Sequence, residues 1–243
     1  RGLGDVYKRQ RYDPGYGPNY PERVALYAPA TGAITVIGIA PDNTHGVTDI
    51  VADDHWVAWI VLGLPELSTD SSWTIYAYHI DTGTTMMIEH HIEPGYPVVA
   101  LNQGKLVWDE LDGGTITGDR SNFTVKLSDL ATDTIQTIAQ HGTDPTISWP
   151  WVSWRHATET DPAAPQAVQV FQNMQTGEQV TLSIMTLEAV LVGTSFAYIP
   201  DYNGGAGDRF IYFPDIHHPD AEWQEYIPAV SYTHLRAHET GRN

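Results

Sequence analysis

The sequence predicts an all-β protein built from repeated units of four short antiparallel strands. Side chains alternate with period two, as in TIYAYHI, and no sustained helical stripe is present. Aromatic residues recur at the same place in successive segments, with spacings of 49, 46 and 44 residues: Trp59, Trp108, Trp154 and Tyr198. Hairpin turns recur with spacings of 51, 50 and 44 residues: Gly32, Gly83, Asp133 and Gly177.

Each unit contains its strands in a fixed order. A leading strand comes first, in VTDIVA, YPVVAL, DPTISW and EAVLVG. A tight turn connects it to the strand with the aromatic residue, in HWVAWIV, KLVWDEL, PWVSWRH and SFAYIPD. A long polar loop leads to the third strand, and a hairpin turn of the Asp-Thr-Gly type leads to the fourth. Four strands repeated at this period are typical of the blades of a β-propeller.

The recurring pattern also resembles a known group of proteins. The units resemble the TolB-like and WD-repeat-like β-propellers over nearly all of residues 22–227. The shared pattern is V-x-W, followed by a loop, I-Y, T-G and a closing strand. We expect a propeller fragment at 11–229, with part of one blade at about 22–39 and four blades at about 41–91, 92–142, 143–185 and 186–227. Because such propellers close with roughly six to eight blades, the fold class expected is an incomplete ring.

The two ends of the chain do not follow the repeat. The opening RGLGDVYKRQ and the closing VSYTHLRAHET can be back-translated as the two strands of one oligonucleotide that resembles a sequencing adapter. Residues 1–10 and 230–243 are therefore expected to be adapter-derived, non-biological and without structure of their own. His234 and His238 have the spacing of zinc ligands on a helix, but they belong to this segment and are not expected to bind metal.

Composition limits the partners. The chain has 12 Lys and Arg against 30 Asp and Glu, which gives a formal net charge of −18. Such a chain repels phosphate groups, so we expect no nucleic-acid partner. No cysteine is present, which excludes disulfides, thiolate metal sites and a cysteine nucleophile. No apolar run approaches about 18 residues, so membrane insertion is not expected.

Two rows of repeated residues are candidates for binding. The repeated aromatics could form a sugar-stacking ladder, but their place on a core strand favours packing between blades. The loops between second and third strands bring acidic residues to one rim. Calcium is the only cofactor that these oxygen donors suggest, against solvated loops as the alternative. The calcium candidates are Asp109, Asp112, Asp119, Asp201 and Asp208.

The loops that link one blade to the next lie on that same rim. They contain histidines that could bind a metal or hydrogen-bond a sugar hydroxyl, with carboxylates that could orient the imidazoles. These candidate ligand-binding residues are His45, His91, His141, Asp42, Glu93 and Asp144.

The resemblance implies a rigid recognition platform rather than an enzyme. We expect a non-enzymatic module of a secreted or cell-surface protein, extracellular or periplasmic, with a protein or a glycan as partner. The alternative is the propeller domain of a larger hydrolase, a serine peptidase or glycosidase, whose catalytic part is missing. The channel strands contain mainly Val, Ile, Ala and Thr, with Asp49 and Glu188 as the only obvious acids, so no catalytic residue is predicted.

Overall fold

The computed structural model describes residues 6–8, 23–42, 44–63, 72–92, 97–112, 122–157, 167–183, 186–200, 210–218 and 224–226. These residues form strands and turns, with no helix among them. Accordingly, the described part of the chain has no helix that is long and apolar enough to cross a membrane.

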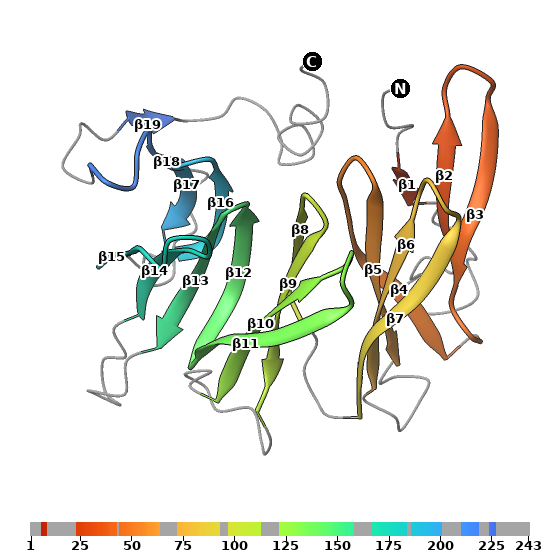
Figure 1. Ribbon diagram of the computed structural model, residues 1–243, viewed down its shortest axis with the longest axis horizontal. Helices are drawn as coiled ribbons and strands as arrows, with labels where there is room; N and C mark the ends of the chain where they lie inside the picture. Colours follow the sequence, from red (N-terminus) through yellow and green to blue (C-terminus); the bar gives the residue numbers. More distant parts are fainter. Residues whose placement is uncertain are drawn as a thin grey trace.

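The strands form five antiparallel sheets that follow one another around an arc (Figure 1). The first sheet contains β1 (Val6–Lys8), β2 (Arg23–Ala28) and β3 (Ala33–Ile39). The second contains β4 (His45–Ala52), β5 (Trp56–Gly63), β6 (Trp73–His79) and β7 (Thr84–His91). The third contains β8 (Val99–Asn102), β9 (Lys105–Leu111), β10 (Phe123–Asp129) and β11 (Thr134–Gln140).

The fourth sheet contains β12 (Gly142–Ser148), β13 (Trp151–Ala157), β14 (Ala167–Asn173) and β15 (Gln179–Leu182). The fifth contains β16 (Thr186–Val192), β17 (Ser195–Pro200), β18 (Phe210–Phe213) and β19 (Gln224–Tyr226). In every sheet, strands that are consecutive in sequence pair with each other. The prediction of an all-β propeller fragment with four-stranded antiparallel blades is confirmed.

One backbone hydrogen bond recurs in all four complete sheets. A residue one to three positions after the third strand donates its N–H to a carbonyl in the turn before the second strand, at 2.8–3.0 Å. The pairs are Ile80 to His55, Leu130 to Gly104, Met174 to Pro150 and Ile216 to Thr194. The four sheets are therefore copies of one structural unit, as the sequence period indicates.

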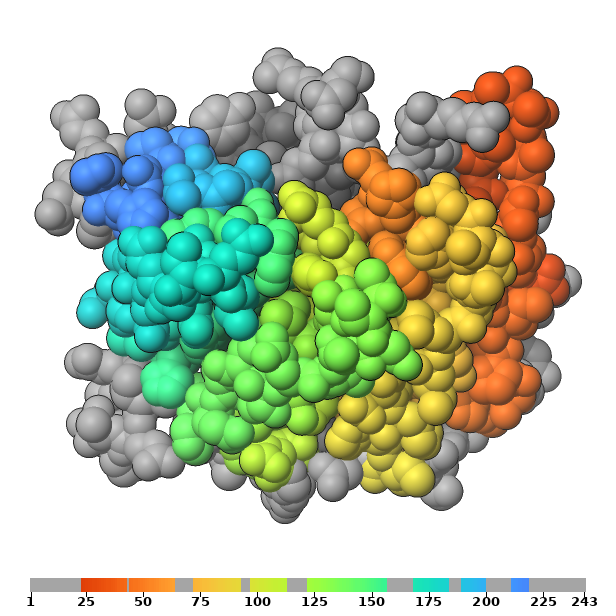
Figure 2. Space-filling view, viewed as in Figure 1, coloured from red at the N-terminus to blue at the C-terminus, as the bar shows by residue number. Residues whose placement is uncertain are grey.

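The repeated aromatics hold successive sheets together. Trp59, Trp108, Trp154 and Tyr198 are at most 4% exposed. A Cβ on Gly38 of β3 would lie 2.5 Å from the Trp59 ring, so the last strand of the first sheet packs directly on the aromatic residue of the second. Figure 2 shows the sheets in continuous contact. As predicted, these rings pack between blades, and their burial leaves no open face for a sugar.

A second link connects the turns between first and second strands, on the rim opposite the histidine loops. In each case a side chain of one turn accepts a hydrogen bond from a backbone N–H of the next sheet's turn. The donors and acceptors are Gly104 N to Asp53 Oδ2 (2.6 Å), Trp149 N to Asn102 Oδ1 (2.9 Å) and Gly193 N to Ser148 Oγ (2.8 Å). These turn-to-turn bonds fix the angle between neighbouring sheets.

The expectation that residues 1–10 take no structure is wrong for Val6–Lys8. These residues form β1, which pairs antiparallel with β2, with Val6 opposite Leu26 and Lys8 opposite Val24. The physical reason is that the edge of β2 presents unpaired backbone groups, which any extended segment can pair with whatever its sequence. Residues 230–243 lie outside the described residues.

Candidate functional site

The candidate histidines lie at one rim of the arc. His45 begins β4, His91 ends β7 and His141 connects β11 to β12. In an up-and-down sheet the first strand begins, and the fourth ends, at the same edge, so all three histidines belong to this edge, which we call the loop rim. It lies at the bottom of the view in Figure 1, where β7 ends and β12 begins. Glu93 lies outside the described residues.

His45 has the carboxylate partner that the sequence suggests. Its Nδ1 lies 2.7 Å from Asp42 Oδ1. Thr44 donates to the same oxygen from its backbone N and its Oγ1, at 2.8 and 2.6 Å. These hydrogen bonds, that of His45 first, lower the pKa of Asp42 from 3.8 to about 2. Asp42 therefore orients the His45 imidazole and stays ionised in moderately acidic solution.

His141 and Asp144 have other neighbours. The ring centroids of His141 and His156 lie 6.3 Å apart with their planes nearly perpendicular, at 78°. Asp144, at φ +53° within β12, binds Arg155 Nη2 through Oδ2 at 2.7 Å. Its backbone N–H donates to Asp109 Oδ2 at 2.9 Å. His45 and His141 therefore have different neighbours.

Two of the five calcium candidates, Asp109 and Asp112, lie among the described residues. Asp109 is 1% exposed, and its Oδ1 accepts the N–H of Val98 at 2.6 Å while its Oδ2 accepts that of Asp144. This carboxylate therefore ties the third sheet to the fourth. Asp112 is exposed just after β9. Asp119, Asp201 and Asp208 lie outside the described residues.

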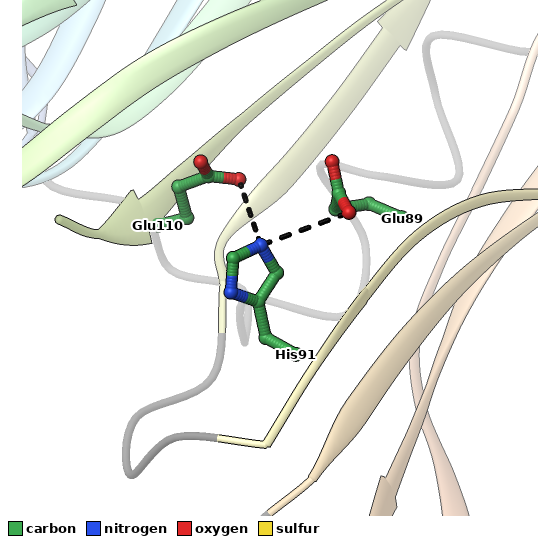
Figure 3. Close-up of side chains that lie close together, drawn as sticks. All are labelled: Glu89, His91 and Glu110. Carbon is green, nitrogen blue, oxygen red and sulfur yellow. Dashed lines mark ion pairs between the residues drawn. The ribbon is translucent and has the colours of Figure 1, made fainter. Parts of the chain in front are cut away.

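A cluster that the sequence did not reveal surrounds His91 (Figure 3). His91 Nε2 lies 3.7 Å from Glu89 Oε1 and 3.7 Å from Glu110 Oε2. Glu89 and His91 come from β7, and Glu110 comes from β9 of the next sheet. Within the described residues these three are the group whose ligand atoms all lie within 4.8 Å of one another. From the sequence, His91 is a ligand candidate and Glu110 belongs to the acidic loops of the same rim, but their meeting with Glu89 was not predicted, because the contact depends on how two sheets pack.

A groove of about 430 Å³ opens between the third and fourth sheets. Its polar lining residues are glutamine, threonine, histidine and tryptophan, with no aspartate, glutamate, lysine or arginine among the described lining residues. Apolar side chains of β11 and β14 complete the walls. The polar residues are Gln140, Trp154, His156, Gln172, Gln179 and Thr181, and the apolar ones are Ile138, Ala139, Val168 and Val170.

No protein-family profile and no curated protein matches the sequence. Solved structures do match. An oligogalacturonate lyase in complex with manganese has a TM-score of 0.58 at 10% identity, over 88% of this chain and 62% of its own. An oligogalacturonate lyase from Vibrio parahaemolyticus has a TM-score of 0.57 at 12% identity, over 88% of this chain and 63% of its own.

The β-propeller domain of the Trilobed protease from Pyrococcus furiosus also matches, with a TM-score of 0.59 at 8% identity, over 85% of this chain and 63% of its own. At these identities the likeness shows the fold, a β-propeller. The chain spans less than two thirds of the length of these propeller proteins.

Proposed function

We propose that this chain is the non-enzymatic recognition part of a secreted or cell-surface protein, and that its partner is a neutral glycan. The groove between the third and fourth sheets carries the proposal. Its volume of about 430 Å³ lies within the range of about 300–1,000 Å³ typical of ligand pockets. Amide, hydroxyl and imidazole groups above an apolar wall suit a ligand that offers many hydroxyls and a weakly polar ring face.

Charge favours a neutral ligand over an acidic one. The chain has a formal net charge of −18, and the described residues that line the groove include no lysine or arginine. A polyanionic sugar would be repelled at long range and would find no cation on arrival. A neutral oligosaccharide avoids both costs.

A second candidate is the propeller domain of a larger hydrolase. The observation that favours it is the likeness to the propeller domain of the Trilobed protease, a propeller that belongs to a protease. In that case the groove would lie on a domain that admits or positions a substrate, while other parts of the protein would supply the chemistry.

The experiment is a titration of the 243-residue chain with neutral oligosaccharides by isothermal calorimetry, with polygalacturonate as the acidic comparison. We expect binding of a neutral ligand, weakened about fivefold by Gln172→Ala, because one hydrogen-bonded contact contributes on the order of 1 kcal/mol. Gln175→Ala, in the exposed turn after β14, is the matched control and should bind like the parent chain. Absence of binding to every neutral sugar, or equal loss in both variants, contradicts the proposal.

A further inference from the structure

The same three positions recur at three successive interfaces between sheets. The last strand of each of the first three sheets has one extra residue opposite the strand before it, at Ile37, Ile88 and Ile138. Three equivalent positions can be compared at each interface. They are the residue directly after this bulge, the residue three positions after the bulge and, on the next sheet's second strand, the residue two positions after the repeated aromatic. The sets are Gly38, Ala40 and Val61; Glu89, His91 and Glu110; and Ala139, His141 and His156.

The first set shows what the fold itself needs at these positions. Ala40 and Val61 are 6% and 4% exposed, so the residues at these two positions are small, apolar and buried. At the second interface the equivalent places hold two carboxylates and an imidazole, with Glu110 only 7% exposed. Burying a carboxylate costs free energy unless it is compensated, so the packing of the sheets does not explain the choice of residues.

Protein groups compensate the cluster only in part. Lys126 Nζ lies 3.1 Å from Glu110 Oε1. Trp108 Nε1 donates to Glu110 Oε2 at 2.9 Å. Glu89 Oε1 accepts the N–H of His90 at 3.0 Å. Among the described residues, the two carboxylates therefore face one ammonium group, which leaves one negative charge beside a ring nitrogen.

The spacing of the three groups suits a shared ion better than hydrogen bonds. Both separations from His91 Nε2 are 3.7 Å, beyond hydrogen-bond range. Four ligands at about 2.0–2.2 Å around a tetrahedral ion lie about 3.3–3.6 Å apart, so small side-chain rotations would complete the geometry. The His91 ring is already oriented, since it stacks on Trp73 at 4.7 Å between centroids and 17° between planes.

We propose that Glu89, His91 and Glu110 bind one divalent transition-metal ion, of the Zn²⁺ or Mn²⁺ type, that clamps the second sheet to the third. One imidazole and two carboxylates are ligands that such ions accept, whereas calcium takes oxygen ligands alone. Trp108 and Lys126 hold the Glu110 carboxylate in place, as groups behind metal ligands do. His91 and Glu89 are 29% and 28% exposed, so solvent and a small ligand can reach the ion from the loop rim.

The test is calorimetric titration of the metal-free 243-residue chain with Zn²⁺, Mn²⁺ and Ca²⁺, paired with thermal unfolding at saturating metal. We expect one Zn²⁺ or Mn²⁺ ion per chain and a higher melting temperature with the ion, because a ligand that binds only the folded state stabilises it. His91→Gln and Glu89→Gln should each weaken binding by about tenfold or more. His90→Gln, a neighbouring histidine outside the cluster, is the matched control and should bind normally.

The two partly exposed substitutions keep the test informative if one variant folds poorly, since each is judged by its metal-dependent shift in melting temperature. Binding that survives both His91→Gln and Glu89→Gln would place the ion elsewhere and overturn the proposal. Tight Ca²⁺ binding at the same site, or absence of Zn²⁺ and Mn²⁺ binding, would overturn it equally.

Discussion

Replacing Trp108 with alanine tests how the sheets are held together. Trp108 is 0% exposed, and it belongs to the core cluster that joins the second sheet to the third. Loss of such a side chain costs about 3–5 kcal/mol of folding free energy. The substitution also removes the N–H that reaches Glu110 Oε2 at 2.9 Å and leaves a buried carboxylate short of a donor, which adds about 1–3 kcal/mol. The expected loss is therefore about 4–8 kcal/mol.

Two other variants separate these terms. Trp108→Phe keeps most of the apolar surface but lacks the donor, so it should lose about 1–3 kcal/mol. Trp154→Ala should lose about 3–5 kcal/mol, the cost of a buried indole alone. Urea unfolding followed by circular dichroism gives each free energy of unfolding. A loss below about 1 kcal/mol in Trp108→Ala would refute the packing role and indicate a surface that serves a ligand instead.

Three further substitutions test the links within and between sheets. Asp53→Ala removes the carboxylate that accepts the N–H of Gly104 (2.6 Å) and the N–H groups of His55 and Trp56 (both 2.9 Å). Urea unfolding should therefore show a loss of about 1–3 kcal/mol in the free energy of unfolding, whereas exposed Asp54→Ala should change it by almost nothing. Equal unfolding midpoints for the two variants would exclude a role for these bonds. Gly142→Ala would bring a Cβ within 2.8 Å of Val125 Cγ2 and 2.9 Å of Trp154 Cδ1. This overpacking should lower the free energy of unfolding by about 1–3 kcal/mol. An unchanged melting temperature would show that the interface can expand. Asp42 has a lowered pKa of about 2, so its contribution to stability is present above about pH 4 and is lost as the pH falls toward 2. Carboxyl NMR titration should show the lowered pKa, and Asp42→Asn should abolish this acid-dependent part of the stability. A measured pKa near 3.8 would contradict the His45 contact.

The strand order could be predicted because it depends on short-range patterns. Period-two alternation marks the strands, and turn residues such as Gly83 and Gly177 mark the hairpins within a few residues. The evenly spaced aromatics mark the second strand of each unit. Burial of Trp108 and Trp154 followed from their recurrence. The pairing of β1 with β2 was missed, since an open edge accepts a strand regardless of its sequence.

The residues around His91 depended on long-range geometry. Glu89 and Glu110 lie on different sheets, and the bulge at Ile88 decides which face of β7 meets β9. No local pattern specifies that face. Alignment of the units strand by strand, with Trp59, Trp108 and Trp154 as anchors, would have placed Glu110 opposite β7. Gln172 and Gln179 of the groove were missed for a similar reason, because a groove is formed by what two sheets leave between them.

Hydrogen–deuterium exchange with and without a saturating neutral oligosaccharide tests recognition at the groove most directly. Slower exchange in the ligand's presence is expected for the backbone amides of residues 138–140 and 168–172, on both walls of the groove, with little change in the turn at Asp53. Protection confined to other segments, or no protection by any neutral sugar that calorimetry shows to bind, would contradict the account.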